Sequence, residues 1–491
     1  MELNVKIFLK KLPLTPIAMK TTFPTIICIL LFFFPSVHQA QSVKRWSIQE
    51  CIEYAIANNY QLAQNTLNVT QSEQTLLQTK AGALPTLNGS ANHTYNFGRR
   101  IDPFSNQFAT NRVLSQNFSL SSNVSLFNGF SNTQTILANQ LAVIAAKYSN
   151  DQLKNDIALQ VTNAFLQIIL ADELFEIADN QLKLTREQTE RGKLLYEAGR
   201  TARGDYLQAE AQLANEELNV IRSKNSVDLA KLSLAQLLSL ESAEEFDISK
   251  PDFDKQAIEL PPYSSKDLFI VAVDKQAGIL GAEYRLKSAE RGLKAAKGGY
   301  SPSLSFFGGI GSGYSQLSRT VIGSTTQQQN VGSFQGQPIL IDVDVPIYEQ
   351  TPFGKQLDQN FNRTFGFSLN VPIFNGLRTK TQVSQQKIAV ENARLQQSIQ
   401  KNQLRRDIQT AWFDARSAFE RYQATSKSVN ALQESYSYIQ QRYDVGLVNA
   451  LEFNTSKNQL LAAKSNLAQA RYEFILRVKV LDFYQGKPIV F

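Results

Sequence analysis

Cysteine and histidine are scarce in this sequence, with two of each among 491 residues. Only Cys51 and His93 follow residue 40, so that part of the chain can form no internal disulfide and no zinc or haem site from these residue types. Cys51 shares an apolar helical stripe with Ile48 and Ile52, which favours a packed thiol over a nucleophile. We therefore expect no catalytic site, cofactor or metal, and a periplasmic hydrolase is the least favoured class of function.

Long apolar runs are also scarce. The run 26–34 follows several lysines and precedes a small residue, Ala40. This is the pattern of a secretory signal peptide, and the run is too short for a spanning helix of about 20 apolar residues. We expect residues 1–40 to be a signal peptide cleaved after Ala40, with either Met1 or Met19 as the start of translation.

No long block of one charge sign is present. The formal net charge is +7, from 50 Lys and Arg against 43 Asp and Glu. The basic residues are scattered along predicted helices rather than clustered, which indicates an evenly solvated surface. Nucleic acid is therefore not an expected partner.

What the sequence does contain is a duplication. FSLSSNVSLFNGF at 118–130 and FGFSLNVPIFNGL at 365–377 lie 247 positions apart. Other pairs of segments also match, at an offset of 247 downstream and of 217 upstream: 196–213 with 443–460, and 79–87 with 296–304. Two copies of one unit, the second with about 30 extra residues between Pro302 and Phe365, is the interpretation that fits both offsets.

The predicted organisation follows from this duplication. Residues 41–240 form the first repeat and 266–491 the second, joined by an acidic, proline-containing linker at 241–265. Each repeat is predicted to hold a helix, a β-hairpin, a very long helix and a last helix. The predicted helices are 46–82, 131–197, 205–240, 266–299, 378–444 and 450–485, and the predicted hairpins are 84–127 and 302–374. The extra residues are polar and rich in Gln and Gly, so we expect an enlarged surface loop.

The helical segments carry coiled-coil spacing. Leu213, Val220, Val227 and Leu234 recur every seven residues, as do the corresponding positions 247 residues later. Sustained seven-residue spacing predicts left-handed coiled-coil packing. A helix as long as 131–197 would span roughly 100 Å at 1.5 Å per residue.

The predicted strands alternate apolar and polar side chains, and the polar side is almost purely Ser, Asn, Thr and Gly. A small sheet packed on a helix in a soluble protein is one explanation. The length of the strands and the aromatic residues near their ends favour a membrane-spanning sheet instead. The side chains predicted to face lipid are Phe118, Leu120, Val124, Leu126, Phe365, Phe367, Leu369, Val371 and Ile373. Those predicted to line a lumen are Ser119, Asn123, Ser368 and Asn370.

Four strands are too few to close a barrel, because the smallest membrane barrels have about eight. An open sheet edge in hydrocarbon is too costly, so the barrel must be shared between chains. A dimer would give a small plugged barrel, whereas a trimer would give one with room for a lumen.

These motifs in this order resemble the TolC-like outer membrane efflux proteins across nearly the whole chain after residue 40. The resemblance rests on V-x-[LI]-F-N-G strand ends, K-x-G-x-x-P-x-L strand starts and Y-x-x-G helical turns, each present twice. It implies an α+β membrane protein of the Gram-negative outer membrane. A homotrimeric β-barrel of twelve strands would continue into a long α-helical coiled-coil barrel in the periplasm. The implied function is a passive exit duct for efflux or secretion, joined to an inner-membrane transporter by a periplasmic adaptor.

The two Y-x-x-G turns are the candidate gate. Each glycine, Gly199 and Gly446, is followed six residues later by a carboxylate, Asp205 and Glu452 respectively. An acidic residue near a helix start is often a cap or a favourable first-turn charge. In a trimer the same turns would meet at the narrow end of the tunnel, where Glu452 would form a ring of negative charge.

The resemblance also implies a link between hairpins, from Tyr443 of the second turn to Asp205 of the first. The family's basic residue in the second turn is replaced here by Val448. Either the latch is weaker than in the family, or Arg203 substitutes for that residue.

The competing hypothesis is an envelope protein that is not a channel, such as a coiled-coil scaffold or adhesin anchored by a small β-barrel. The duplication weighs against it, because an adhesin has no need of two equivalent hairpins. The sequence leaves the exported substrate and the identity of pump and adaptor open.

Overall fold

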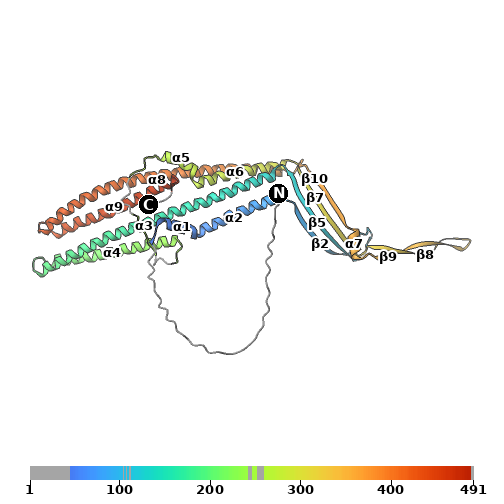
Figure 1. Cartoon of the computed structure of the whole chain (residues 1–491), viewed down its shortest axis with the longest axis horizontal. Coiled ribbons are helices and arrows are strands. Elements are labelled where there is room, and N and C mark those ends of the chain that lie inside the picture. Colours follow the sequence, from blue (N-terminus) through green and yellow to red (C-terminus); the bar gives the residue numbers. More distant parts are fainter. Residues whose placement is uncertain are drawn as a thin grey trace, which may run out of the picture. The chain divides into compact units, whose positions relative to one another are not determined.

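The computed structural model describes residues 45–102, 104–106, 108–109, 112–241, 246–251 and 259–487. The predicted signal peptide at 1–40 and parts of the predicted linker at 241–265 lie outside these residues. The described chain combines long helices with a sheet of long strands (Figure 1).

Each helix of the first repeat has a counterpart in the second at the offsets found in the sequence. The helices of the first repeat are α1 (Ile48–Asn58), α2 (Tyr60–Ala81), α3 (Ser131–Glu197) and α4 (Arg203–Leu237). Their counterparts are α5 (Ser265–Lys275), α6 (Ala277–Lys297), α8 (Arg378–Asp444) and α9 (Ala450–Tyr484). Both α3 and α8 have 67 residues and span the ranges predicted for them. A 3₁₀ turn, Gly298–Tyr300, follows α6.

The prediction of one continuous first helix in each repeat is wrong. Residues 46–82 divide into α1 and α2 at Asn59, and 266–299 divide into α5 and α6 at Gln276. Both residues have extended backbones, with ψ of 119° and 122°. The Asn59 side chain accepts a hydrogen bond from the backbone N–H of Leu62, at 2.9 Å, and so caps the new helix. Asparagine in that position was the signal for the break.

The main sheet takes two strands from each repeat. They are β2 (Thr86–Asn96) and β5 (Val113–Asn128) from the first, and β7 (Ser303–Ser315) and β10 (Asn362–Asn370) from the second. The order is β10-β7-β5-β2, all antiparallel, so the β5–β7 pair joins the two repeats. Among the described residues, β2 and β10 each have a partner strand on one side only.

The extra residues of the second repeat, predicted as an enlarged surface loop, have regular secondary structure of their own. They form an antiparallel ribbon of β8 (Arg319–Phe334) and β9 (Gln337–Gln350), followed by the short helix α7 (Phe353–Gln359). The connecting residues Gln335 and Gly336 both have positive φ, as tight hairpin turns require. The alternation in ILIDVDVPI was the overlooked strand signal.

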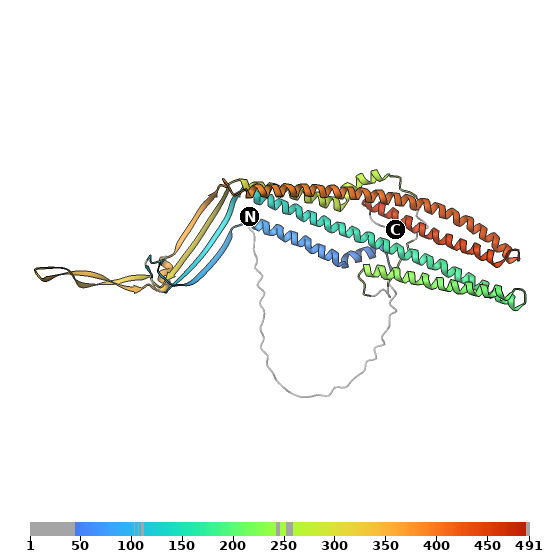
Figure 2. The ribbon, with the colours of Figure 1, turned by 180° about the vertical axis from the view of Figure 1, so that it is seen from behind.

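The hydrophobic core lies where the short helices α1 and α5 run beside the long ones (Figure 2). Cys51 is fully buried there, against side chains such as Phe165 and Leu234. A second cluster holds Leu268, Ile408 and Leu481. These clusters fix the middle of the helical region, since buried aliphatic and aromatic side chains each contribute about 1.5–3 kcal/mol.

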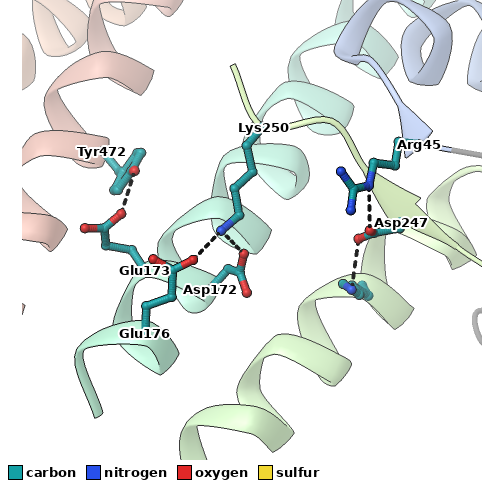
Figure 3. A network of polar contacts seen from close by, with 8 residues as sticks. Arg45, Asp172, Glu173, Glu176, Asp247, Lys250 and Tyr472 are labelled. Atoms are coloured by element: carbon teal, nitrogen blue, oxygen red, sulfur yellow. Dashed lines mark hydrogen bonds and ion pairs between the residues drawn. The ribbon is translucent and has the colours of Figure 1, made fainter. Parts of the chain in front are cut away.

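The described part of the linker is tied to the helices rather than free. Its strand β6 (Asp247–Ile248) pairs in parallel with β1 (Arg45–Trp46). Asp247 also forms an ion pair with Lys231 of α4, at 3.0 Å. Lys250 lies between Asp172 and Glu176 of α3 (Figure 3). Burial favours the neutral amine of Lys250, but the two carboxylates outweigh it and raise the pKa above its usual range. A short antiparallel pair, β3 (Arg100–Ile101) and β4 (Phe108–Ala109), lies in the connection that joins β2 to β5 along the chain.

Candidate functional site

One face of the main sheet is apolar across all four strands. The register places Leu120 of β5 opposite Ile310 of β7, and Phe367 and Leu369 of β10 opposite Phe306 and Leu304 of β7. The β10 side chains are open to the surroundings: Phe365 is 79% exposed, Phe367 68% and Leu369 67%. Such a wide exposed apolar face requires either lipid or another protein surface.

Three of the residues predicted for this face depart from simple alternation. A register shift between Ser125 and Phe127 makes Leu126 the extra residue of a β-bulge, so that Phe127 rather than Leu126 lies opposite Leu304. Val371 and Ile373 lie beyond the end of β10, which stops at Asn370 instead of continuing to 374. Pro372 explains the early end, because it has no N–H for the ladder. Phe118, Leu120 and Val124 lie at register positions of the apolar face.

The opposite face is polar and contains the residues predicted to line a lumen. Ser119 and Asn123 pair with Ser90 and Thr86 of β2, and Ser90 and Ser119 are hydrogen-bonded through their hydroxyls at 2.7 Å. One exception is Phe307 of β7. It lies opposite Gly366, where an added Cβ would come within 3.0 Å of the Phe307 ring. Alternation alone did not single out this aromatic side chain.

At the end of the sheet far from the helices, a buried polar cluster holds the connection between β2 and β5. Asp102 is buried and accepts hydrogen bonds from the Ser315 hydroxyl, at 2.7 Å, and from the Ser105 N–H, at 2.8 Å. Burial alone would raise the pKa of Asp102, but these hydrogen bonds hold it below the usual range. Phe104 lies against Gly313 on the polar face, in the space that a Cβ would need.

Both helical turns have the geometry that their glycines predict. Gly199 and Gly446 have φ of 73° and 80°, the left-handed conformation in which a helix C-terminus favours glycine. Asp205 and Glu452 each lie in the first turn of the next helix. The Asn449 side chain caps α9 by accepting a hydrogen bond from the Glu452 N–H, at 2.9 Å. Neither acid caps its helix, since α4 has no side-chain cap and Asn449 caps α9, but the first-turn dipole role considered for both acids fits their positions.

The single chain does not bring Tyr443 and Asp205 together by any hydrogen bond among the described residues. The Tyr443 ring stacks on Phe453 of its own hairpin, with centroids 4.5 Å apart. The polar contact between the hairpins near the turns is instead an ion pair from Arg191 of α3 to Asp444 of α8, at 3.0 Å. No sequence pattern pointed to this ion pair, because its members are 253 residues apart.

A buried lysine also joins the two helical hairpins. Lys457 of α9 is 3% exposed, and its ammonium donates to the Thr185 hydroxyl, at 2.7 Å, and to the Gln188 side-chain oxygen, at 3.1 Å. Both partners belong to α3. Burial lowers the pKa of Lys457 to about 8, against an opposing effect of Glu216 on α4. Sequence reasoning missed this residue, because a lysine on a coiled-coil helix is usually solvated.

No group of three or more His, Cys, Asp or Glu side chains that could hold a metal ion occurs among the residues described.

The chain matches the family model for outer membrane efflux proteins over residues 51–239 and 272–486. It is 22% identical to the outer membrane efflux protein BepC of Brucella suis, over 86% of this chain and 81% of that one. It is 21% identical to the outer membrane protein TolC of Escherichia coli, over 93% of this chain and 85% of TolC.

Solved structures show the same fold. The outer membrane protein VceC of Vibrio cholerae superposes with a TM-score of 0.71 at 16% identity, covering 90% of this chain and 97% of VceC. The MtrE outer membrane channel of Neisseria gonorrhoeae, in its open state, superposes with a TM-score of 0.63 at 20% identity, covering 89% and 88%.

Proposed function

The chain belongs to the outer membrane efflux protein family, and we propose that it forms the outer-membrane exit duct of a tripartite efflux or secretion system. In this proposal three copies build one channel, the apolar face of the sheet contacts lipid, and the polar face lines the lumen. The helices continue the duct into the periplasm, where an adaptor joins it to an inner-membrane transporter. The duct itself is passive, since the transporter supplies the energy.

The observation that carries this proposal is a four-stranded sheet with an exposed apolar face and two unpaired edges. In lipid every backbone N–H and C=O needs a protein partner, so these edges must meet other copies of the chain. The internal repeat supports one way of meeting. Because β5 of the first repeat pairs with β7 of the second inside the chain, β10 of the second would pair in the same way with β2 of the next copy.

The helices support the same arrangement. Helix α3 packs on α6 of the second repeat, and the rings of Tyr148 and Tyr284 stack there with centroids 5.5 Å apart. The positions equivalent to these tyrosines are Leu395 on α8 and Leu67 on α2. Both leucines are open in the single chain, 60% and 68% exposed. If copies repeat the internal contact, Leu395 of one packs on Leu67 of the next, which would bury both.

This geometry gives a direct test on the purified protein. A chain carrying both Leu67→Cys and Leu395→Cys should form disulfides between copies and run as a covalent trimer under non-reducing conditions. The two single variants are the matched controls and should not. The wild-type trimer in a planar bilayer should pass ions through one central pore.

The outcomes separate the competing functions. Covalent trimers that never conduct would overturn the duct and favour the anchored scaffold or adhesin. Conducting protein without the double-cysteine crosslink would keep the duct and reject the proposed contact between copies.

A further inference from the structure

The ribbon β8–β9 has one strongly aliphatic face. Alternate residues of β9 place five β-branched side chains on the same face, opposite uncharged Gly, Thr and Gln of β8. We call them the aliphatic stripe: Ile339, Ile341, Val343, Val345 and Ile347. Four of the five side chains are exposed, because no other element of the described chain covers them, and Val343 is half-buried.

The other face of the ribbon is different in kind. It carries Asp342 and Asp344, and the Thr326 hydroxyl donates a hydrogen bond to Asp344 at 2.8 Å. Two prolines, Pro338 and Pro346, lie at register positions of that face too. From Pro338 to Ile347, charge and proline lie on one face of the ribbon and only aliphatic and neutral groups on the other, with Glu349 following on the stripe side at the base. A ribbon of this kind is built to be covered on the side of the stripe.

A two-stranded ribbon is at best marginally stable alone in water. An exposed, uncharged stripe of β-branched residues would also promote edge-to-edge aggregation. The structure therefore calls for an occupant of this face.

The base of the ribbon is fixed to the main sheet. Thr351, directly after β9, is buried; its N–H donates to the Ser318 carbonyl, at 3.0 Å, and its hydroxyl is 2.7 Å from that of Thr320. The Gln356 side chain bridges the backbone of Thr351 and that of Ser315, the last residue of β7. The ribbon is thus anchored at the end of the sheet opposite the helices.

That anchor decides which occupant is favoured. The ribbon lies between β7 and β10 in the chain, and β10 is the edge strand that pairs with the next copy in the proposed channel. Three ribbons would therefore rise from one closed ring, held at matching heights. A stripe without charge complements itself, so the neighbouring ribbons can cover it without unpaired charges.

We propose that the aliphatic stripe is an interaction surface for the ribbons of the other two copies, so that three ribbons pack together beyond the outer end of the barrel. This inference rests on the trimeric assembly in the proposed function. It assigns the insertion of the second repeat a role in holding the trimer together outside the lipid.

The test compares two variants, each with one new cysteine on one face of the ribbon. The only other cysteine after residue 40 is the buried Cys51. Val343→Cys places a thiol on the stripe, and Asp344→Cys places one on the opposite face as the matched control. Intact cells are treated with a bismaleimide of about 10 Å span, the spacing of sheets packed face to face. A second sample is treated with a maleimide polyethylene glycol that does not cross membranes.

We expect part of the Val343→Cys chain to shift from the monomer to the dimer position on a denaturing gel, because each chain offers one accessible thiol and a bismaleimide joins two. The Val343→Cys thiol should also be protected from the polymer. Asp344→Cys should remain monomeric and be labelled by the polymer. Polymer labelling of both variants alike would overturn the proposal, because the stripe would then be open. Protection of Val343→Cys without crosslinking would also overturn it, since something other than a second copy would cover the stripe. Wild-type chain that forms no trimer on a native gel would overturn the proposed function and this inference together.

Discussion

The two repeats have the same elements but not the same neighbours. Gly129 and Gly376 occupy equivalent turns between a strand and a long helix, with φ of 65° and 64°. A Cβ at Gly129 would lie 2.4 Å from the carbonyl oxygen of Gly298, whereas at Gly376 nothing lies within 4 Å. The first repeat therefore has its partner, the second repeat, inside the chain. The second repeat lacks such a partner among the described residues, and in the proposed trimer the first repeat of the next copy would take that place.

The largest expected effect breaks this comparison at the open edge. Leu369 lies on the apolar face of β10, and Ser368 lies next to it on the polar face. Leu369→Arg should cost about 2–4 kcal/mol per chain if that face meets lipid near the middle of the membrane. Ser368→Arg should be tolerated, because its side chain would enter a wet lumen. Trimer yield in the outer membrane fraction measures both, and equal losses would reject the assignment of faces.

The next effect concerns Lys457, whose equivalent in the first repeat is the exposed Glu210. The pKa of Lys457 is about 8 in the folded chain against 10.5 for an ordinary lysine. Between these values the unfolded chain binds more protons, so wild-type stability should rise with pH there. A shift of this size is worth about 3 kcal/mol, at 1.36 kcal/mol per pKa unit.

The variant Lys457→Met removes that titration. Its melting temperature should exceed that of wild type at pH 7, and most of the gain should be lost by pH 10. Glu210→Gln is the control and should show the wild-type pH dependence. A gain in Lys457→Met that stays constant from pH 7 to 10 would show that the lysine is not buried in the assembled protein.

Much of the fold could be predicted from periodicity. The bounds of α3 and α8 follow from the F-N-G segments before them and from Gly199 and Gly446 after them. The sides of the strands on which Leu120 and Phe367 lie follow from an alternation of two residues. What could not be predicted depends on contacts distant in sequence. The ion pair of Arg191 with Asp444 and the burial of Lys457 arise only when the two helical hairpins pack together.

Local signals were also misread in two places. The apolar pattern continues across Asn59 and so predicts one longer helix, whereas the Asn59 cap begins a new one. The polar composition of β8 predicts a loop, although the alternation in β9 indicates a strand. In both cases one strong local feature outweighed the average composition of the segment.

The smallest expected effect concerns the gate, where the link between Tyr443 and Asp205 stays a prediction for contacts between copies. The ion pair of Arg191 with Asp444 is exposed, and such pairs contribute only about 0–1 kcal/mol. A hydrogen bond to a charged group contributes about 1.5–3 kcal/mol. The double variant Tyr443→Phe with Asp205→Ala should therefore raise resting conductance in a planar bilayer more than Asp444→Asn does.

Charge at the same end of the duct should show separately from closure. Glu452→Gln should leave resting conductance near that of wild type but lower the preference for cations, because it removes one carboxylate per copy from the proposed ring. Reversal potentials in a salt gradient measure this preference. A double variant that forms trimers yet conducts like wild type would make Tyr443 and Asp205 ordinary turn residues. Closure would then depend on how the helical hairpins pack, with Lys457 between them, and not on a latch at the turns.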